Sequence, residues 1–171
     1  RALEIYRASF RPSAWLEQPY AMIGVPVICA DDHATAEHLA GPSAYSFLQL
    51  RRGRPTQLPH PDEVAGLEFT PMDRELLRQW TAPLVLGSPD EVVEQLHELA
   101  GRTRVDEIMV TTMVHGHDDR MRSYELLARA WGMPGEAVGA GQSSHERTAS
   151  TTSSSGCDHT NSSTASITAS A

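Results

Sequence analysis

The stretch at residues 106–131, DEIMVTTMVHGHDDRMRSYELLARAW, combines a strand pattern, a polar turn and a helix pattern in that order. Residues 108–114 form an uncharged, β-favouring run, which is typical of a parallel strand covered on both faces. The polar residues 115–118, HGHD, end the run. Apolar residues then recur at helical spacing over 121–131, and Gly132 predicts the helix end. In α/β proteins the loop after a strand's carboxyl end commonly holds the functional residues.

Two more strand patterns precede this unit, at residues 20–30 (YAMIGVPVICA) and 83–87 (PLVLG). A helix pattern follows each of them, beginning near His33 after the first and at Ser88 after the second. This alternation is typical of parallel βαβ units. Pro26 in the first strand argues against a central position in a regular ladder, because proline has no N–H to donate. The sequence therefore predicts an α/β fold with about three strand–helix units.

Proline and glycine set the expected limits of the helices. The Gly41-Pro42 pair is expected to interrupt the helix after the first strand, and Gly101 is expected to end the helix after the second. Thr70-Pro71 is typical of a helix start, with threonine as the cap and proline in the first turn. An earlier helix is expected over residues 2–10, with Trp15 packed under the corner that follows it.

A long segment, residues 54–70, is rich in proline and holds at most a short helix at 62–66. A loop of this length in a compact domain is usually a lid, a binding insertion or a linker. Arg51, Arg52 and Arg54 lie where it begins. Their position fits the end of a helix, where cations are favoured, and an anion-binding cluster is the alternative.

Composition limits the class of protein. The chain has 171 residues and a net charge of −8, which argues against nucleic acid or an acidic membrane surface as a partner. No apolar stretch is long enough to span a bilayer. The two cysteines, Cys29 and Cys157, fit free thiols in a reducing cytoplasm better than a disulfide or a cysteine metal site.

The two ends of the chain differ in character. The chain begins with Arg1 inside a helix pattern, so we expect it to be a fragment of a longer protein. Residues 136–171 are rich in Ser and Thr, and they offer too little apolar surface to offset the entropy of ordering. The sequence therefore predicts a domain portion at 1–135 and a disordered tail at 136–171.

The polar turn after the last strand holds the main candidates for chemistry. His115, His117 and Asp118 could ligate a metal ion, as in a metal-dependent hydrolase, although no further ligand is evident. The alternative is that Asp118 or Asp119 caps the final helix, where the helix dipole favours a carboxylate. A third interpretation is that the loop lines a pocket, where a histidine can donate a hydrogen bond or transfer a proton.

The Gly87-Ser88 turn has two interpretations as well. Backbone donors at a helix start can hold an anion. The spacing of Ser88 and Glu91 favours a purely structural cap, in which these two side chains satisfy the donors themselves. The fingerprints GxGxxG, GxSxG and HExxH and the Walker loop are all absent from the sequence.

Several stretches, in order, resemble the later half of luciferase-like flavin-dependent monooxygenases. They are residues 6–13 (YRASFRPS), 19–25 (PYAMIGV), 48–55 (LQLRRGRP), 87–92 (GSPDEV) and 106–128, which resembles the last strand and helix of that family. The resemblance implies the C-terminal portion of a TIM-like (β/α)8 barrel. It also implies reduced FMN as cofactor, O2 as cosubstrate, a small-molecule substrate, and a flavin reductase or a second copy of the chain as partner.

Within this resemblance, Thr112, His115 and His117 are predicted to lie nearest the catalytic face, as cofactor-binding or pocket-lining residues rather than metal ligands. The family's catalytic residues have no counterpart that can be assigned in this chain, so we expect it to be marginally stable and inactive alone. Half a barrel would leave strand edges unpaired. Two alternatives stay open: the metal-dependent hydrolase, and a non-catalytic barrel remnant that pairs with another chain.

Overall fold

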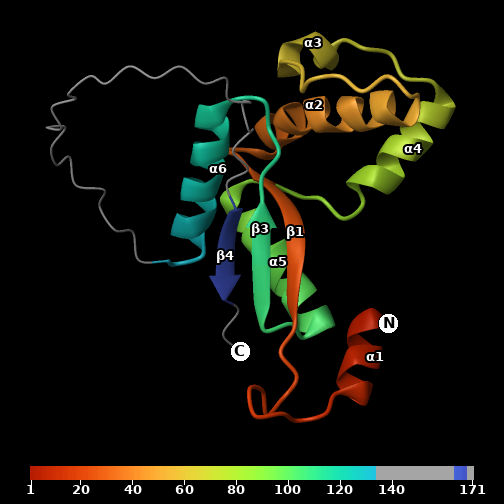
Figure 1. Cartoon of the computed structure of the whole chain (residues 1–171). Helices are drawn as coiled ribbons and strands as arrows, with labels where there is room; N and C mark the ends of the chain where they lie inside the picture. Colours follow the sequence, from red (N-terminus) through yellow and green to blue (C-terminus); the bar gives the residue numbers. More distant parts are fainter. Residues whose placement is uncertain (134–163, 169–171) are drawn as a thin grey trace, which may run out of the picture.

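The computed structural model describes residues 1–133 and 164–168. Helices and strands alternate along most of this part of the chain (Figure 1). In order, the elements are α1 (Ala2–Ser9), β1 (Met22–Cys29), α2 (His33–Arg51), α3 (Pro61–Ala65), α4 (Pro71–Thr81), β2 (Val85–Gly87), α5 (Pro89–Thr103), β3 (Glu107–Thr111), α6 (His117–Ala130) and β4 (Thr164–Thr168).

Three strands of the sheet are parallel, as the alternation of strands and helices predicts. The strand order is β2-β1-β3-β4. The ladder with β3 covers Met22 to Pro26, and the ladder with β2 begins at Val27. Pro26 therefore lies where the pairing changes from one neighbour to the other. The missing N–H of Pro26 argued against a central position in the sheet. Pro26 can occupy such a position because the two ladders are staggered.

The position of β2 differs from that of a middle strand in a consecutive barrel, which would lie between its two sequence neighbours. β2 has three residues and pairs only with the last three residues of β1, on the edge away from β3. The described residues thus form a mixed α/β unit with a three-stranded parallel sheet, without a closed barrel wall.

A fourth strand, β4, pairs antiparallel with the whole of β3. β4 lies inside residues 136–171, where the sequence predicts a disordered tail and no strand. The other residues of this segment, including Cys157, lie outside the described residues. Both strands have a physical reason to pair. β3 would otherwise expose a row of unpaired N–H and C=O groups, and the sequence TASIT contains β-branched residues that favour a strand.

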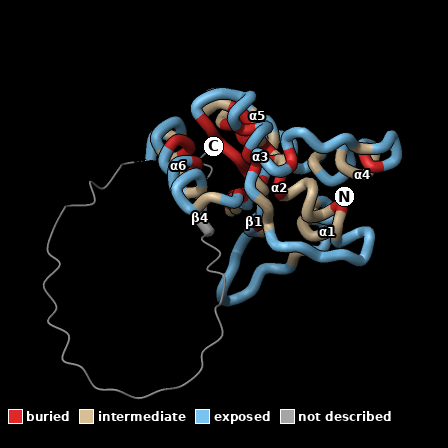
Figure 2. Tube along the Cα trace, turned by 90° about the horizontal axis from the view of Figure 1, so that it is seen from above, coloured by how far each residue is buried: buried red, intermediate tan, exposed pale blue. Residues whose placement is uncertain are grey.

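One face of the sheet is covered by α5 and α6. Alternate residues of β1 and β3 are buried there against these two helices. Figure 2 shows buried residues along α5 and α6 in red. The main members of this core are Val25, Val27, Cys29, Val92, Leu96, Ile108, Val110, Leu126 and Leu127. The opposite side chains of β3, Met109 and Thr111, are only half-buried, so the expectation of a strand covered on both faces was wrong for β3.

A second, smaller core lies toward the carboxyl ends of β1 and β3, where α2 crosses the sheet. Figure 1 shows α2, α3 and α4 beyond these ends and α1 beyond the opposite ends. Ile28 and Ala30 pack there against Ala36, Leu39 and Ala40 of α2. Residues of α2 and α4 thereby border the sheet at the carboxyl ends of its strands.

Several helix limits differ from expectation. α2 continues through Pro42, whose ring is buried. α5 runs past Gly101 to Thr103 and ends at Arg104, which itself adopts the left-handed conformation at φ 51°. The local signals of Gly41-Pro42 and Gly101 thus misplaced both limits, because a proline or a glycine lowers helix propensity without excluding the helix.

Other helix ends follow the sequence. Thr70 caps α4, its hydroxyl accepting from Asp73 N at 3.2 Å. Arg52 caps the end of α2 and pairs with Asp73 at 2.7 Å, which supports the structural interpretation of the arginines. Trp15 is 95% exposed, so the expectation that it packs under the first corner was wrong. Among the described residues, no helix has the length and apolar content needed to cross a membrane.

Candidate functional site

A cavity of about 190 Å³ opens on the face of the sheet opposite α5 and α6, at the carboxyl ends of β1 and β3. Pro26 and Thr111 are register partners on the two strands, so their side chains share this face. Met113, two residues beyond Thr111, is 62% exposed at the same place. The far wall comes from the corner between α4 and β2, with Trp80, Pro83 and Leu84.

The cavity is apolar, and none of the described residues that line it has an ionisable side chain. Two of its hydroxyl groups are committed to helix backbones: Ser43 donates to Ala40 O at 2.9 Å, and Thr81 donates to Leu77 O at 3.0 Å. Within the described part of the chain, the Thr111 hydroxyl has no hydrogen-bond partner. One free hydroxyl in an apolar hollow can orient an uncharged ligand.

Thr112 faces the other way. It is 7% exposed, and its hydroxyl donates to Val27 O at 2.9 Å, which ties β3 to β1. Its backbone N–H donates to the Tyr124 hydroxyl at 3.1 Å. Thr112 therefore does not line the cavity; its neighbours Thr111 and Met113 do.

The two histidines of the polar turn have separate partners. His115 Nδ1 lies 2.8 Å from Leu58 O, and its ring meets His60 edge-on at 5.4 Å. This contact holds the Pro-rich segment before α3 against the loop after β3. His117 instead contacts the Arg120 guanidinium at 3.1 Å, on the first turn of α6.

The metal-dependent alternative finds no support in this geometry. Among residues 1–133, no three or more His, Cys, Asp or Glu side chains are grouped so as to hold a metal ion. Asp118 and Asp119 lie in the first turn of α6, and Gly116 is the cap, so the expectation that either aspartate caps the helix was wrong. The dipole still favours both carboxylates at this position.

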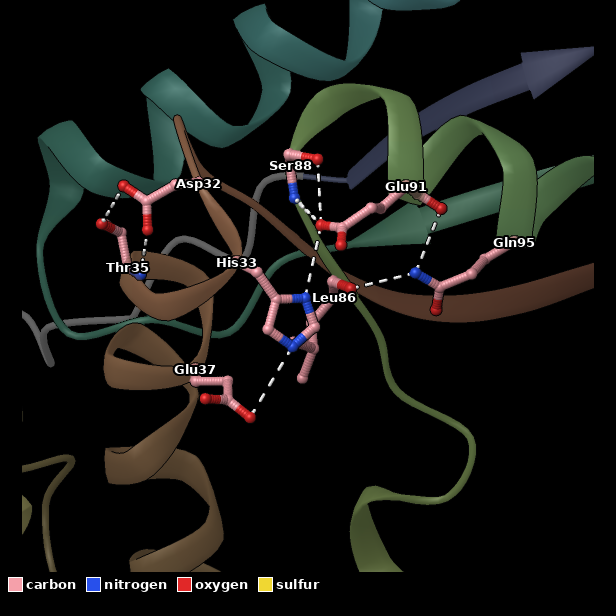
Figure 3. A network of polar contacts seen from close by, with 8 residues as sticks. All are labelled: Asp32, His33, Thr35, Glu37, Leu86, Ser88, Glu91 and Gln95. Atoms are coloured by element: carbon pink, nitrogen blue, oxygen red, sulfur yellow. Dashed lines mark hydrogen bonds and ion pairs between the residues drawn. The ribbon is translucent and has the colours of Figure 1, made fainter.

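A polar network joins the starts of α2 and α5 (Figure 3). Glu91 accepts from Ser88 N at 2.7 Å and from the Ser88 hydroxyl at 2.9 Å, and His33 Nδ1 lies 3.3 Å away. These contacts, led by the Ser88 backbone N–H, lower the pKa of the Glu91 carboxyl. Gln95 donates to Leu86 O at 3.0 Å. Because Glu91 occupies the helix start, the structure favours the cap over an anion site.

The buried thiol of Cys29 lies in an environment that lowers its reactivity. Its burial, with a smaller contribution from Asp31, raises its pKa to about 11. The Cys29 N–H donates a hydrogen bond to the Ser123 hydroxyl of α6 at 2.9 Å. Arg122 of the same helix pairs with Asp31 at 2.7 Å. A thiol that stays protonated at neutral pH is a poor nucleophile. The contacts of Cys29 and Asp31 with α6 are therefore structural, and they hold α6 against β1.

Parallel strands whose carboxyl ends border an apolar cavity define an α/β protein with a cavity at a place where such folds commonly bind ligands. No family model matches the chain. It is 36% identical over 126 residues to a luciferase-like monooxygenase of Escherichia coli K12, and 42% identical over 130 residues to the uncharacterized protein YvbT of Bacillus subtilis strain 168. These matches cover 74% and 76% of this chain, but only 38% and 39% of the relatives.

A solved structure agrees with these matches. The crystal structure of apo-MsnO8 superimposes with a TM-score of 0.67 at 31% identity, over 79% of this chain and 41% of that one. The chain belongs to the luciferase-like monooxygenase family. It spans about two fifths of the length of the curated relatives it matches.

The cavity residues were not among the sequence candidates. A signal for part of them was present: if Ile108 and Val110 face the helices, a period of two places Thr112 with them and puts Thr111 and Met113 on the opposite face. No local signal indicates Trp80, because its place at the cavity depends on how α4 meets β2.

Proposed function

We propose that the chain supplies part of the flavin and substrate pocket of a flavin-dependent monooxygenase that uses reduced FMN and O2. The apolar cavity at the carboxyl ends of β1 and β3 carries this proposal. Family membership supports the reaction class. Bound reduced flavin would supply the electrons for activation of O2, and the protein would position it and shield it from water.

The donor set fits the ring portion of a flavin or an organic substrate. Thr111 can hydrogen-bond a carbonyl or ring nitrogen, and Met113 and Trp80 can cover an apolar ring. No cation lines the cavity, so the phosphate of FMN requires residues from elsewhere. This division fits a chain that matches about two fifths of its relatives.

A TIM-like barrel is the frame we propose for the complete protein. Among the described residues, no strand pairs with the β2 side of β1 before Val27. A second hollow of about 370 Å³ runs beside this edge, lined in part by Ile23, Gly24 and Leu99. A further strand at this edge would satisfy the free backbone groups. In this setting the chain would act in the cytoplasm, with a flavin reductase or a second copy as partner.

One observation favours the alternative of a non-catalytic remnant. β4 covers the edge of β3 that another barrel strand would need. A chain whose own C-terminal segment closes that edge would resist completion by a partner. The two functions therefore differ in whether residues 1–133 accept further strands.

The test is a chimera in which this chain replaces the matched residues of the Escherichia coli luciferase-like monooxygenase. Anaerobic titration with reduced FMN should show saturable binding by the chimera and none by the 171-residue chain alone. Tight flavin binding and cooperative unfolding by the isolated chain would contradict the expected inactivity. A folded chimera that binds no reduced FMN would support the remnant.

A further inference from the structure

The chemistry of the cavity is specific enough to restrict what occupies it. Its volume of about 190 Å³ exceeds the roughly 150 Å³ of an apolar protein cavity that takes up benzene. One six-membered ring with a small substituent is therefore the size of group that fits. A complete FMN molecule is too large for this hollow alone.

An aromatic wall favours a flat group. Trp80 lies at the cavity and is 44% exposed. One face of its indole stacks on Phe47 of α2, with ring centroids 4.1 Å apart and planes 6° apart. This stack braces the indole, so Trp80 offers the cavity its other face or its edge, as aromatic pairs prefer.

Charge selects against ionic ligands. With no ionisable lining residue, a carboxylate or ammonium group would lose its hydration without gaining a partner. The hydroxyls of Ser43 and Thr81 already donate to backbone carbonyls, which leaves Thr111 as the polar anchor at the end of β3.

We propose that this cavity is a subsite for one uncharged six-membered ring whose single polar substituent is hydrogen-bonded by Thr111. The inference deepens the proposed function and rests on it for its biological setting. The ring could belong to the organic substrate or to the flavin itself. Met113 and Leu84, on opposite walls, would then limit the size of the ring that enters.

The experiment titrates the 171-residue chain with benzamide, benzoate, benzylamine and toluene, followed by NMR. The same titrations on the chimera keep the test decisive if the isolated chain is largely unfolded. Benzamide should bind at least about tenfold more tightly than either charged probe, with NOEs from its ring to the methyl groups of Met113 and Thr111. Equal binding of benzoate, or NOEs elsewhere, would overturn the proposal.

Variants test the anchor separately. Thr111→Val keeps the shape of the side chain but removes the hydroxyl. It should weaken the affinity for benzamide about fivefold, as for the loss of one neutral hydrogen bond, and leave the affinity for toluene unchanged. Thr56→Val, at an exposed residue outside the cavity, is the matched control and should change neither. Unchanged benzamide affinity in Thr111→Val would refute the role of Thr111.

Lumiflavin distinguishes the two sources of the ring. If it displaces benzamide competitively, the subsite holds the flavin ring; if both bind together, the subsite holds the organic substrate. Ring binding is measured without FMN or turnover. A chimera that binds the ring but not reduced FMN would therefore refute the proposed function and leave the ring subsite standing.

Discussion

Replacing Thr112 by valine tests whether this residue ties the sheet together or lines a pocket. Its hydroxyl is buried and donates to Val27 O at 2.9 Å, between β3 and β1. Loss of such a bond costs about 0.5–1.5 kcal/mol, and a buried acceptor left without its partner raises the cost to about 1–3 kcal/mol. We expect Thr112→Val to lower the free energy of unfolding by about 2 kcal/mol.

The assay is urea denaturation followed by circular dichroism, with sucrose in every sample to raise the folded fraction. With a slope of about 2 kcal/mol per molar urea, the midpoint should fall by about 1 M. Thr111→Val is the matched control, because the same atoms change one residue away, at a hydroxyl that has no hydrogen-bond partner among the described residues. It should shift stability by no more than about 0.5 kcal/mol.

The reasoning fails if the two variants are equally stable, or if Thr111→Val is the more damaging. Ring binding provides the converse readout, since it should respond to Thr111→Val and not to Thr112→Val. A reversed pattern would restore Thr112 as the pocket residue, as the sequence alone suggested.

Three further predictions concern stability and reactivity. Gly87→Ala should cost more than about 1 kcal/mol, because φ is 147° and a Cβ atom would lie 2.5 Å from the Glu91 carboxylate, whereas Gly101→Ala in open space on α5 should be neutral or stabilising in the same melts. The pKa of Asp73 is lowered chiefly by the Thr70 hydroxyl, so its contribution is present above the unfolded pKa and is lost as pH falls through the lower folded value; Asp73→Asn should flatten the acid limb of stability measured from pH 5 to 2. Cys29, with a pKa of about 11, should react with Ellman's reagent at pH 8 only as fast as the chain unfolds, in a variant whose other cysteine is serine; immediate labelling of folded protein would contradict its burial.

Much of the fold follows from local sequence signals. The three parallel strands and the helices after them were predictable, because hydrophobic periodicity and capping residues act locally. Thr70 and Glu91 show this, since each makes its capping contacts within three residues.

The parts that could not be predicted depend on distant contacts. Pro42 stays within α2 with its ring buried, although its local preference is to interrupt a helix. The place of β2 on the outer edge of β1, rather than between β1 and β3, is a property of the ladder register. β4 pairs with a strand more than fifty positions earlier in the sequence, which periodicity does not reveal.

The cavity lies at the end of the sheet where the sequence places the candidate residues, but other side chains line it. His115 lies on the loop after β3 and contacts Leu58, whereas His117 begins α6 and contacts Arg120. The cavity instead uses Thr111 and Met113, together with Trp80 from a distant helix. Whether Thr112, His115 and His117 contact a cofactor stays a prediction.

The most direct test of the central claim is O2 uptake by the chimera supplied with reduced FMN. We expect flavin-dependent O2 uptake above the spontaneous rate of free reduced FMN. A Leu84→Trp variant that fills the cavity and still folds should take up O2 more slowly. Uptake at the spontaneous rate in a folded chimera, or uptake unaffected by filling the cavity, would contradict the central claim.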